Sequence, residues 1–153
     1  MSTITVTVRR RLEAPAAALF DVLVDPARFA TVRGVRSVEI LRSGRDGDRS
    51  VGTVRRVDLV AGHLVEEIVG LEAPARFDYL IRGASVPFDH RFGRIELADR
   101  GDHTEAAWTS TVALGRPPVG AALGVAARPV LRAAFATALG EMDRAARRRA
   151  DGR

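Results

Sequence analysis

The sequence predicts an α+β domain in which a curved, seven-stranded antiparallel sheet wraps around one long C-terminal helix, with two short helices after the first strand. Three observations predict this architecture. A β-period pattern over residues 4–12 gives way to two short helical patterns that end near Phe29. Alternating runs separated by turn signals then fill residues 35–114, and an Ala-rich segment with helical spacing follows Pro117. Short connections between strands favour antiparallel neighbours, and one helix must then cover the sheet.

The first strand is predicted from alternation. Ile4, Val6 and Val8 alternate with polar residues, and Leu12 continues their phase. This period of two is typical of a strand with one buried face. Arg10 shares the buried phase, so we expect its side chain on the inner face as well.

Two proline steps predict the two short helices. Pro15 stands where a first helical turn tolerates proline, and apolar residues then recur at helical spacing, namely Ala18, Leu19, Val22 and Leu23. Asp25 and Pro26 form a second helix-start signal. An aspartate can cap the N-terminus of a helix, and the fixed φ of proline suits the first turn. A second helix should therefore run through Phe29. Both helices are expected to plug one edge of the sheet.

Six further strands are predicted between turn signals, over residues 35–41, 51–60, 63–71, 76–82, 88–98 and 104–114. A tight hairpin at Ala61 and Gly62 should join the third and fourth strands of the sheet. That register makes Arg55 and Glu66 diagonal neighbours, about 7–8 Å apart. The same register predicts three directly opposed pairs: Val57 with Glu66, Arg55 with Ile68, and Arg56 with Glu67 on the outer face.

A long helix is predicted after Pro117, where large apolar residues recur at helical spacing: Leu131, Phe135, Leu139 and Met142. Pro129 lies within this pattern. Proline removes one hydrogen bond of the helix, so we expect a kink there or a separate short helix over residues 119–128.

Composition bounds the class of protein. The 153 residues suit one domain, with 46% hydrophobic and 28% charged residues. We expect this domain to cover residues 1–145, followed by a basic, frayed tail over 146–153. No apolar run approaches the ~20 residues that span a bilayer, and the N-terminus lacks a secretory signal, so a cytoplasmic protein without membrane insertion is expected. Cysteine is absent, which excludes disulfides and thiolate chemistry.

The positive charge of the chain does not by itself predict an anionic partner. The formal net charge is +5, and all 24 basic residues are arginine. The densest cluster comprises Arg144, Arg147, Arg148 and Arg149. A solvated helix end is favoured over contact with an anionic surface, and no module or aromatic platform predicts specific nucleic-acid binding.

Familiar catalytic and cofactor motifs do not occur. The sequence has no Gly-x-Ser-x-Gly pentapeptide. His63, His90 and His103 lie in or beside turns or in a strand without the spacing of metal ligands, and a polar turn at residues 43–48 contains two acidic residues that would repel phosphate. We therefore predict no metal and no cofactor.

Alternation also predicts which polar side chains face the concave side of the sheet. The inward phases carry Arg36, Arg55, Tyr79, Trp108 and Ser110. Two assignments stay open at this point, because residues 63–71 support either phase for Glu66, and residues 88–98 support either Arg91 or His90. A dry core could not hold so many charged groups, so the pattern indicates a cavity with access to water.

Several phrases, in their order and spacing, resemble the START/Bet v 1-like (SRPBCC) helix-grip superfamily, in its polyketide cyclase/dehydrase and lipid-transport branch. They are the Leu-Glu-Ala-Pro entry at 12–15, the Asp-Pro step at 25–26, Val-Gly-Thr-Val-Arg at 51–55, Ala-Pro-Ala-Arg-Phe-Asp-Tyr at 73–79, and His-Thr at 103–104 before Trp108. The match spans essentially the whole chain. It implies a helix-grip fold with a cavity between sheet and helix. Members bind sterols, lipids, hormones, quinones or polyketides, and some catalyse ring closure and dehydration.

The resemblance also chooses between the open phases. It implies an inward Glu66, because the superfamily often has an inward glutamate there. It favours Arg91 over His90, since that register resembles the abscisic-acid-receptor branch.

The expected function is binding or transfer of a small, mainly apolar ligand such as a lipid or a polyketide. The expected ligand-binding residues are Arg36, Arg55, Glu66, Tyr79, Arg91, Trp108, Ser110, Leu131 and Phe135. Two alternatives stay open. In the first, a cyclase or dehydratase uses Glu66, Tyr79 and Arg55 as acid, base and oxyanion donors, or His90 as base in the other phase. In the second, a non-catalytic module binds a partner through the Arg-rich end. Structural readings also stand, with Arg55 and Glu66 as an ion pair between strands, and Tyr79 and Trp108 as core.

Overall fold

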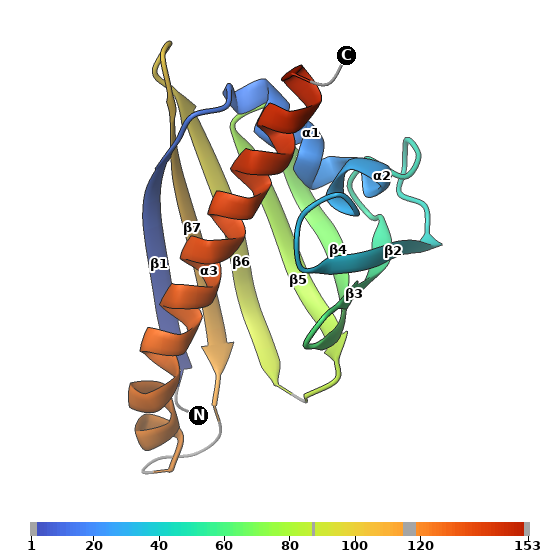
Figure 1. Cartoon of the computed structure of the whole chain (residues 1–153). Coiled ribbons are helices and arrows are strands. Elements are labelled where there is room, and N and C mark those ends of the chain that lie inside the picture. Colours follow the sequence, from blue (N-terminus) through green and yellow to red (C-terminus); the bar gives the residue numbers. More distant parts are fainter. Residues whose placement is uncertain (1–2, 87, 115–118, 152–153) are drawn as a thin grey trace.

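A seven-stranded antiparallel sheet curves around one long helix in the computed structural model, which describes residues 3–86, 88–114 and 119–151 (Figure 1). The strand order is β1-β7-β6-β5-β4-β3-β2. This is the predicted helix-grip fold. In chain order the elements are β1 (Thr3–Leu12), α1 (Ala16–Val24), α2 (Pro26–Phe29), β2 (Val35–Arg42), β3 (Val54–Leu59), β4 (Gly62–Glu72), β5 (Arg76–Ala84), β6 (Asp89–Asp99), β7 (Thr104–Ala113) and α3 (Val119–Asp151).

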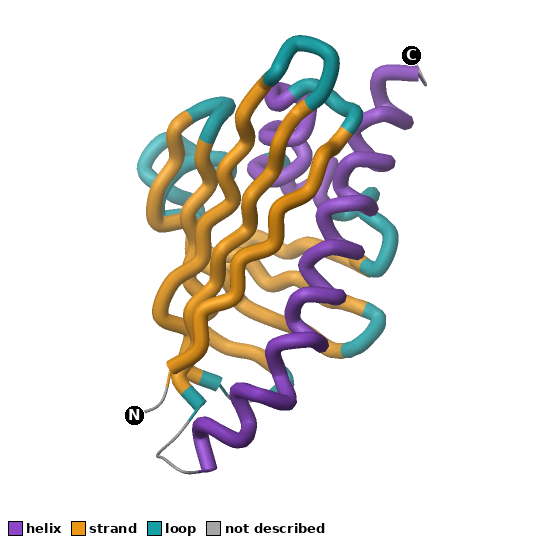
Figure 2. Tube along the Cα trace, turned by 90° about the vertical axis from the view of Figure 1, so that its left-hand side faces the viewer, coloured by secondary structure: helices purple, strands orange, loops and turns teal. Residues whose placement is uncertain are grey.

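Helix α3 covers only part of the concave face. It packs mainly against β1 and α1 and crosses the sheet obliquely (Figure 2). One core cluster joins α1 and the C-terminal part of α3 to the middle of the sheet, and a smaller one joins β1 and β7 to the middle of α3. Beyond β1 and β7 the sheet is contacted mainly by the short helices, with α1 against β5 and β6 and α2 against β2.

The link from β1 into α1 is fixed by two buried polar side chains. The carboxylate of Asp143 on α3 accepts hydrogen bonds from the backbone N–H groups of Glu13 and Ala14, at 3.1 and 2.8 Å. The Thr104 hydroxyl on β7 donates to the carbonyl of Ala14 at 2.7 Å. These bonds satisfy backbone groups that would otherwise be buried without partners. They tie the C-terminal part of α3 to the sheet.

The Asp25-Pro26 step caps α2 as predicted. The Asp25 carboxylate accepts from the N–H groups of Ala27 and Arg28, at 3.0 and 3.4 Å, and Pro26 occupies the first turn. The same carboxylate lies 2.7 Å from the guanidinium of Arg49. The cap therefore also holds the long loop between β2 and β3.

The hairpin between β3 and β4 turns one position earlier than the sequence suggested. Leu59 pairs with Gly62, so the turn residues are Val60 and Ala61, and Arg55 stands directly opposite Glu66. The predicted diagonal register is wrong. Gly62 has a φ of +147°, and a Cβ there would lie 2.7 Å from the Ser85 hydroxyl, so glycine suits this first paired position.

The predicted outer-face pair between Arg56 and Glu67 is also wrong, for the same reason. Arg56 stands opposite Val65, and its guanidinium bonds to Asp58 at 3.1 Å. Glu67 instead lies 3.2 Å from Arg82 on β5.

A β-bulge in β6 resolves the two phases that competed there. The register shifts between His90 and Phe92, which makes Arg91 the extra residue. As a result His90 and Gly93 are both buried on the inner face. Arg91 is exposed and pairs with Asp89 at 2.6 Å, so the expected inward Arg91 is wrong.

Helix α3 runs unbroken through Pro129, so a separate short helix over 119–128 is not formed. Pro129 and Val125 are exposed, and water can reach the carbonyl that the proline leaves without a partner.

No helix in the described ranges is long and apolar enough to cross a membrane. At the other end α3 continues to Asp151 and Ala146 is buried, while residues 152–153 lie outside the described part. The boundary at residue 145 stays a prediction.

Candidate functional site

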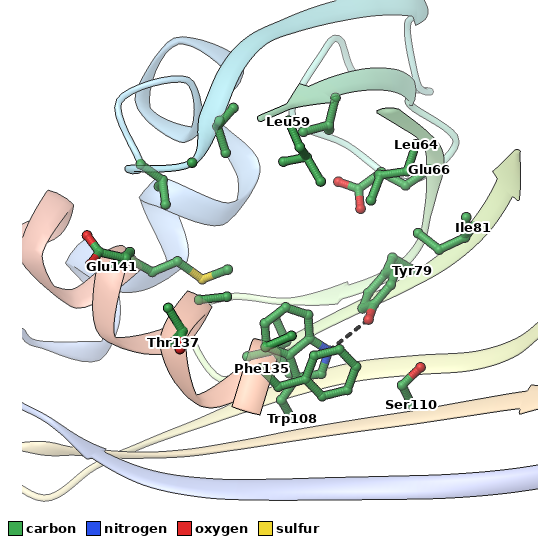
Figure 3. A pocket seen from close by; sticks show the side chains of 18 of the residues that line it. Leu59, Leu64, Glu66, Tyr79, Ile81, Trp108, Ser110, Phe135, Thr137 and Glu141 are labelled. Carbon is green, nitrogen blue, oxygen red and sulfur yellow. Dashed lines mark hydrogen bonds between the residues drawn. The ribbon is translucent and has the colours of Figure 1, made fainter. Parts of the chain in front are cut away.

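A cavity of about 690 Å³ lies between the concave face of the sheet and α3 (Figure 3). This volume falls within the range of about 300–1,000 Å³ that is typical of small-molecule sites. Side chains from α1, α2, α3 and strands β2 to β7 line it. Most are apolar, among them Leu23, Phe29, Val57, Leu64, Ile81, Ile95, Leu131 and Met142.

Small side chains on α3 help to create this space. Ala133, Ala134, Thr137 and Ala138 face the cavity and fill little of it. The exposed Val60 and Phe88 also line it, at 69% and 44% relative exposure, so the mouth lies beside the β3–β4 turn and the start of β6.

An ion pair lies at one side of the cavity. Arg55 on β3 is fully buried, and its Nε donates to Oε1 of Glu66 on β4 at 2.6 Å. The guanidinium carbon lies 4.7 Å from the ring centroid of Phe29 and 5.6 Å from that of Phe77. Aromatic faces stabilise the cation there. The guanidinium is thus enclosed by protein, and Glu66 is the member of the pair that points into the cavity (Figure 3).

His90 is held in one tautomer. The backbone N–H of Ile81 donates to Nδ1 at 3.1 Å, so the neutral ring carries its proton on Nε2. Nε2 lies 2.9 Å from the hydroxyl oxygen of Ser110, to which it donates. Burial lowers the pKa of His90 to about 4, although the charge of Asp89 opposes the shift. The ring is therefore neutral near pH 7.

Tyr79 extends across the floor of the cavity toward Trp108. The indole Nε1–H donates to the phenol oxygen at 2.7 Å (Figure 3). The phenol ring lies over Gly93, where a Cβ would come within 2.5 Å of its Cζ, and stacks on His90 with centroids 5.2 Å apart. Burial raises the pKa of Tyr79, and the charge of Glu66 raises it further. The phenol therefore stays protonated.

An aromatic stack connects the sheet to the helix inside the cavity. The rings of Trp108 on β7 and Phe135 on α3 lie 4.3 Å apart between centroids and are nearly parallel, at 5°. Trp108 is the single tryptophan of the chain. Its fluorescence can therefore report on the contents of the cavity.

Seven of the nine expected ligand-binding residues line this cavity: Arg55, Glu66, Tyr79, Trp108, Ser110, Leu131 and Phe135. Arg91 does not, because of the β6 bulge. Arg36 does not either: the register of β2 shifts between Val35 and Ser37, which leaves Arg36 exposed beside a shallow polar hollow on the outer surface. The inward placement of Arg36 was wrong for the same physical reason as that of Arg91.

Arg10 keeps its predicted phase but does not reach the cavity. It is exposed and donates to the backbone carbonyl of Ala136 on α3. Conversely, His90, Thr137 and Glu141 line the cavity although they were not among the nine. Thr137 and Glu141 are four residues apart on α3, and this helical spacing is the signal that could have found them.

The histidines do not gather at the site. His63 contacts Ser85 and His103 contacts Asp102, both at the surface. Within the described ranges, no group of three His, Asp or Glu side chains could hold a metal ion.

Solved structures with the same fold come from diverse proteins. The aromatase/cyclase Zhui from a Streptomyces species has a TM-score of 0.72 at 20% identity, with 97% of this chain and 96% of that chain covered. A START superfamily protein from Mycobacterium smegmatis has a TM-score of 0.66 at 16% identity, covering 92% and 97%. Truncated norcoclaurine synthase from Thalictrum flavum has a TM-score of 0.66 at 15% identity, covering 93% and 92%. At such identities the likeness is one of fold.

Sequence comparison is more specific. No curated protein matches the chain significantly. The family model described as polyketide cyclase / dehydrase and lipid transport, however, matches residues 3–147, nearly the whole length. The chain therefore belongs to the polyketide cyclase/dehydrase and lipid-transport family.

Proposed function

We propose that this protein binds a small, mainly apolar ligand, such as a lipid or a polyketide, in the cavity between the sheet and α3, and acts as a binding or transfer protein. The cavity itself carries this proposal. It has the volume of a small-molecule site, apolar side chains form most of its wall, and a few polar groups are grouped at particular points.

The polar and apolar groups have different parts in the proposed binding. Trp108, Phe135 and Leu131 form walls against which an apolar body packs. Tyr79 and Ser110 present hydroxyl groups, and Glu66 presents a carboxylate. Arg55 contributes indirectly by holding Glu66, because its guanidinium is enclosed.

Fluorescence of Trp108 tests the proposal directly. Titration with phenylnaphthylamine, a neutral and mainly apolar probe, should give saturable one-to-one binding with quenching of Trp108. Ala138→Phe places a ring in the cavity and should weaken binding by about tenfold or more, since a well-packed space does not admit both groups. Val69→Phe is the matched control, because Val69 is an exposed residue of β4. Unsaturable binding, or equal affinity in both variants, would contradict the proposal.

A second candidate function is cyclisation or dehydration of a poly-β-carbonyl chain in the same cavity. The observation in its favour is the buried Glu66 carboxylate that points into the cavity and could move a proton. Incubation with such a substrate, followed by mass spectrometry of the products, separates the two functions. In an enzyme Glu66→Gln should abolish product and leave substrate retention largely intact. In a carrier no product forms in either protein.

The partner-binding alternative has less support. Three side chains of the Arg-rich cluster contact their own chain: Arg144 contacts Glu141, Arg147 contacts Asp143, and Arg148 donates to the carbonyl of Thr31. The first two contacts lie within α3, and the Arg148 bond attaches α3 to the segment after α2.

A further inference from the structure

We infer that the hydroxyl groups of Tyr79 and Ser110 form one subsite that binds a neutral carbonyl oxygen of the ligand. The inference rests on the proposed function and names the ligand more narrowly, as an apolar molecule that carries a ketone, quinone or ester carbonyl.

The first step concerns Ser110. A hydroxyl group accepts hydrogen bonds through its oxygen and donates one through its hydrogen. The N–H of Ile81 fixes the tautomer of His90, so Nε2 is a donor and fills an accepting site of the Ser110 oxygen at 2.9 Å. The hydroxyl hydrogen of Ser110 therefore points elsewhere.

The second step concerns Tyr79, which is arranged in the same way. The Trp108 indole N–H is a donor only, and it fills an accepting site of the phenol oxygen at 2.7 Å. The indole N–H on β7 thus polarises the phenol group. The hydroxyl hydrogen of Tyr79 remains free to donate to another acceptor. In the described part of the chain, neither hydroxyl donates to a carbonyl or carboxylate oxygen of the protein.

The third step places the two hydroxyls side by side. Tyr79 on β5 stands opposite Gly93 on β6, and Gly93 stands opposite Ser110 on β7. Because Gly93 has no side chain, the phenol ring lies over it and reaches toward β7. Burial dominates the raised pKa of Tyr79, and a hydrogen-bonding contribution from Ser110 opposes it, consistent with neighbouring hydroxyls. Both groups face the cavity (Figure 3).

The fourth step identifies the charge of the bound oxygen. Two hydroxyl donors suit an oxygen acceptor, as in sites that bind carbonyl groups. Arg55, the cation beside the cavity, already pairs with Glu66 at 2.6 Å. An anionic oxygen at the two hydroxyls would therefore be a buried charge without its own cationic partner, whereas a neutral carbonyl needs only hydrogen-bond donors. The subsite therefore favours a ketone or quinone over a carboxylate.

Three naphthalene probes of similar size test the inference by calorimetry on the full chain: acetylnaphthalene, ethylnaphthalene and naphthoate. The ketone should bind about tenfold more tightly than the hydrocarbon, the effect of one good buried hydrogen bond. Tyr79→Phe and Ser110→Ala should each weaken ketone binding by about fivefold to tenfold and change hydrocarbon binding by less than about twofold. Thr111→Ala, which removes a hydroxyl on the outer face of β7, should change neither.

Infrared spectroscopy of the bound, isotopically labelled ketone reports directly on hydrogen bonding to its carbonyl. If Tyr79 had only a structural role, the carbonyl frequency would not change in its variant. Its carbonyl stretching frequency should be lowered in the native protein and rise in Tyr79→Phe. Equal affinity for ketone and hydrocarbon, tightest binding of naphthoate, or an unchanged frequency would overturn the subsite. If none of the three probes binds, the proposed function fails together with the subsite.

Discussion

Two polar groups share one cavity, and they differ in charge and in how the protein holds them. Arg55 and Glu66 neutralise each other at 2.6 Å, and aromatic rings flank the guanidinium. Tyr79 and Ser110 accept hydrogen bonds from fixed N–H groups and keep their own hydrogens. Leaving a buried ion without its partner costs about 3–5 kcal/mol, whereas leaving a neutral polar group without one costs about 1–3 kcal/mol. The first group therefore joins β3 to β4, although Glu66 also faces the cavity, and the second offers its hydrogens to a ligand.

The largest expected effect comes from breaking the ion pair on one side. Arg55→Met leaves the Glu66 carboxylate buried without its partner, which should lower the free energy of unfolding by about 3–5 kcal/mol. Chemical denaturation followed by circular dichroism measures it. The double variant Arg55→Met with Glu66→Met removes both charges and should regain most of the loss. If the single variant were as stable as the native protein, the pair would have no structural role.

A smaller effect is expected from Gly93→Ala. The added Cβ would lie 2.5 Å from the Tyr79 ring, so the ring must move, at a cost of about 2–3 kcal/mol. Thermal or urea unfolding measures the cost. Gly83→Ala is the matched control, because its nearest atoms would lie 3.9 Å away, an ordinary contact. Equal stability of the two variants would show that Tyr79 is not held over Gly93.

Acid should weaken the Tyr79–Ser110 side of the cavity through His90. Its pKa is lowered to about 4 in the folded protein, mainly by burial, from an ordinary 6.5. Between these two pH values the unfolded chain binds more protons than the folded protein. The contribution of the neutral His90 to the free energy of unfolding is therefore fully present above pH 6.5 and is lost as the pH falls toward 4. The loss should be about 2 kcal/mol, because part of the ring faces the cavity and is not fully desolvated.

Urea unfolding at pH 7 and at pH 4.5 measures this dependence, and His90→Gln removes the titrating group. The variant should lose less stability than the native protein over the same interval. A native protein whose His90 titrates near 6.5 by nuclear magnetic resonance would contradict the neutral, donating ring on which the Ser110 geometry depends.

The smallest effect concerns an ion pair outside the cavity. Arg56 and Asp58 lie 3.1 Å apart, with side chains 41% and 34% exposed. Arg56→Ala should change the free energy of unfolding by less than about 1 kcal/mol, because solvent screens such pairs. A cost near that of Arg55→Met would mean that burial does not distinguish the two pairs.

Local signals in the sequence predicted most of the fold. The alternation of Ile4, Val6 and Val8 and the cap at Asp25 depend on neighbouring residues, and both are formed as expected. The contact between Arg55 and Glu66 was also predicted, because a tight turn brings these strands together in either register.

Features that depend on a pairing strand were not predictable in the same way. The bulges at Arg36 and Arg91 change the phase of a strand without any change in its own alternation. The bonds from Asp143 to Glu13 and Ala14 join residues about 130 positions apart, which no local pattern records. The hydroxyl pair depends on Gly93, which reads as a weak strand residue until its two neighbours across the sheet are known.

The affinity for acetylnaphthalene in two variants tests the central claim most directly. Calorimetry should give a dissociation constant within about threefold of the native value for the double variant of Arg55→Met and Glu66→Met, because the pair holds the sheet. Tyr79→Phe should weaken binding by about tenfold, because the phenol holds the ligand oxygen. The opposite pattern, with binding lost in the double variant and retained in Tyr79→Phe, would contradict the account.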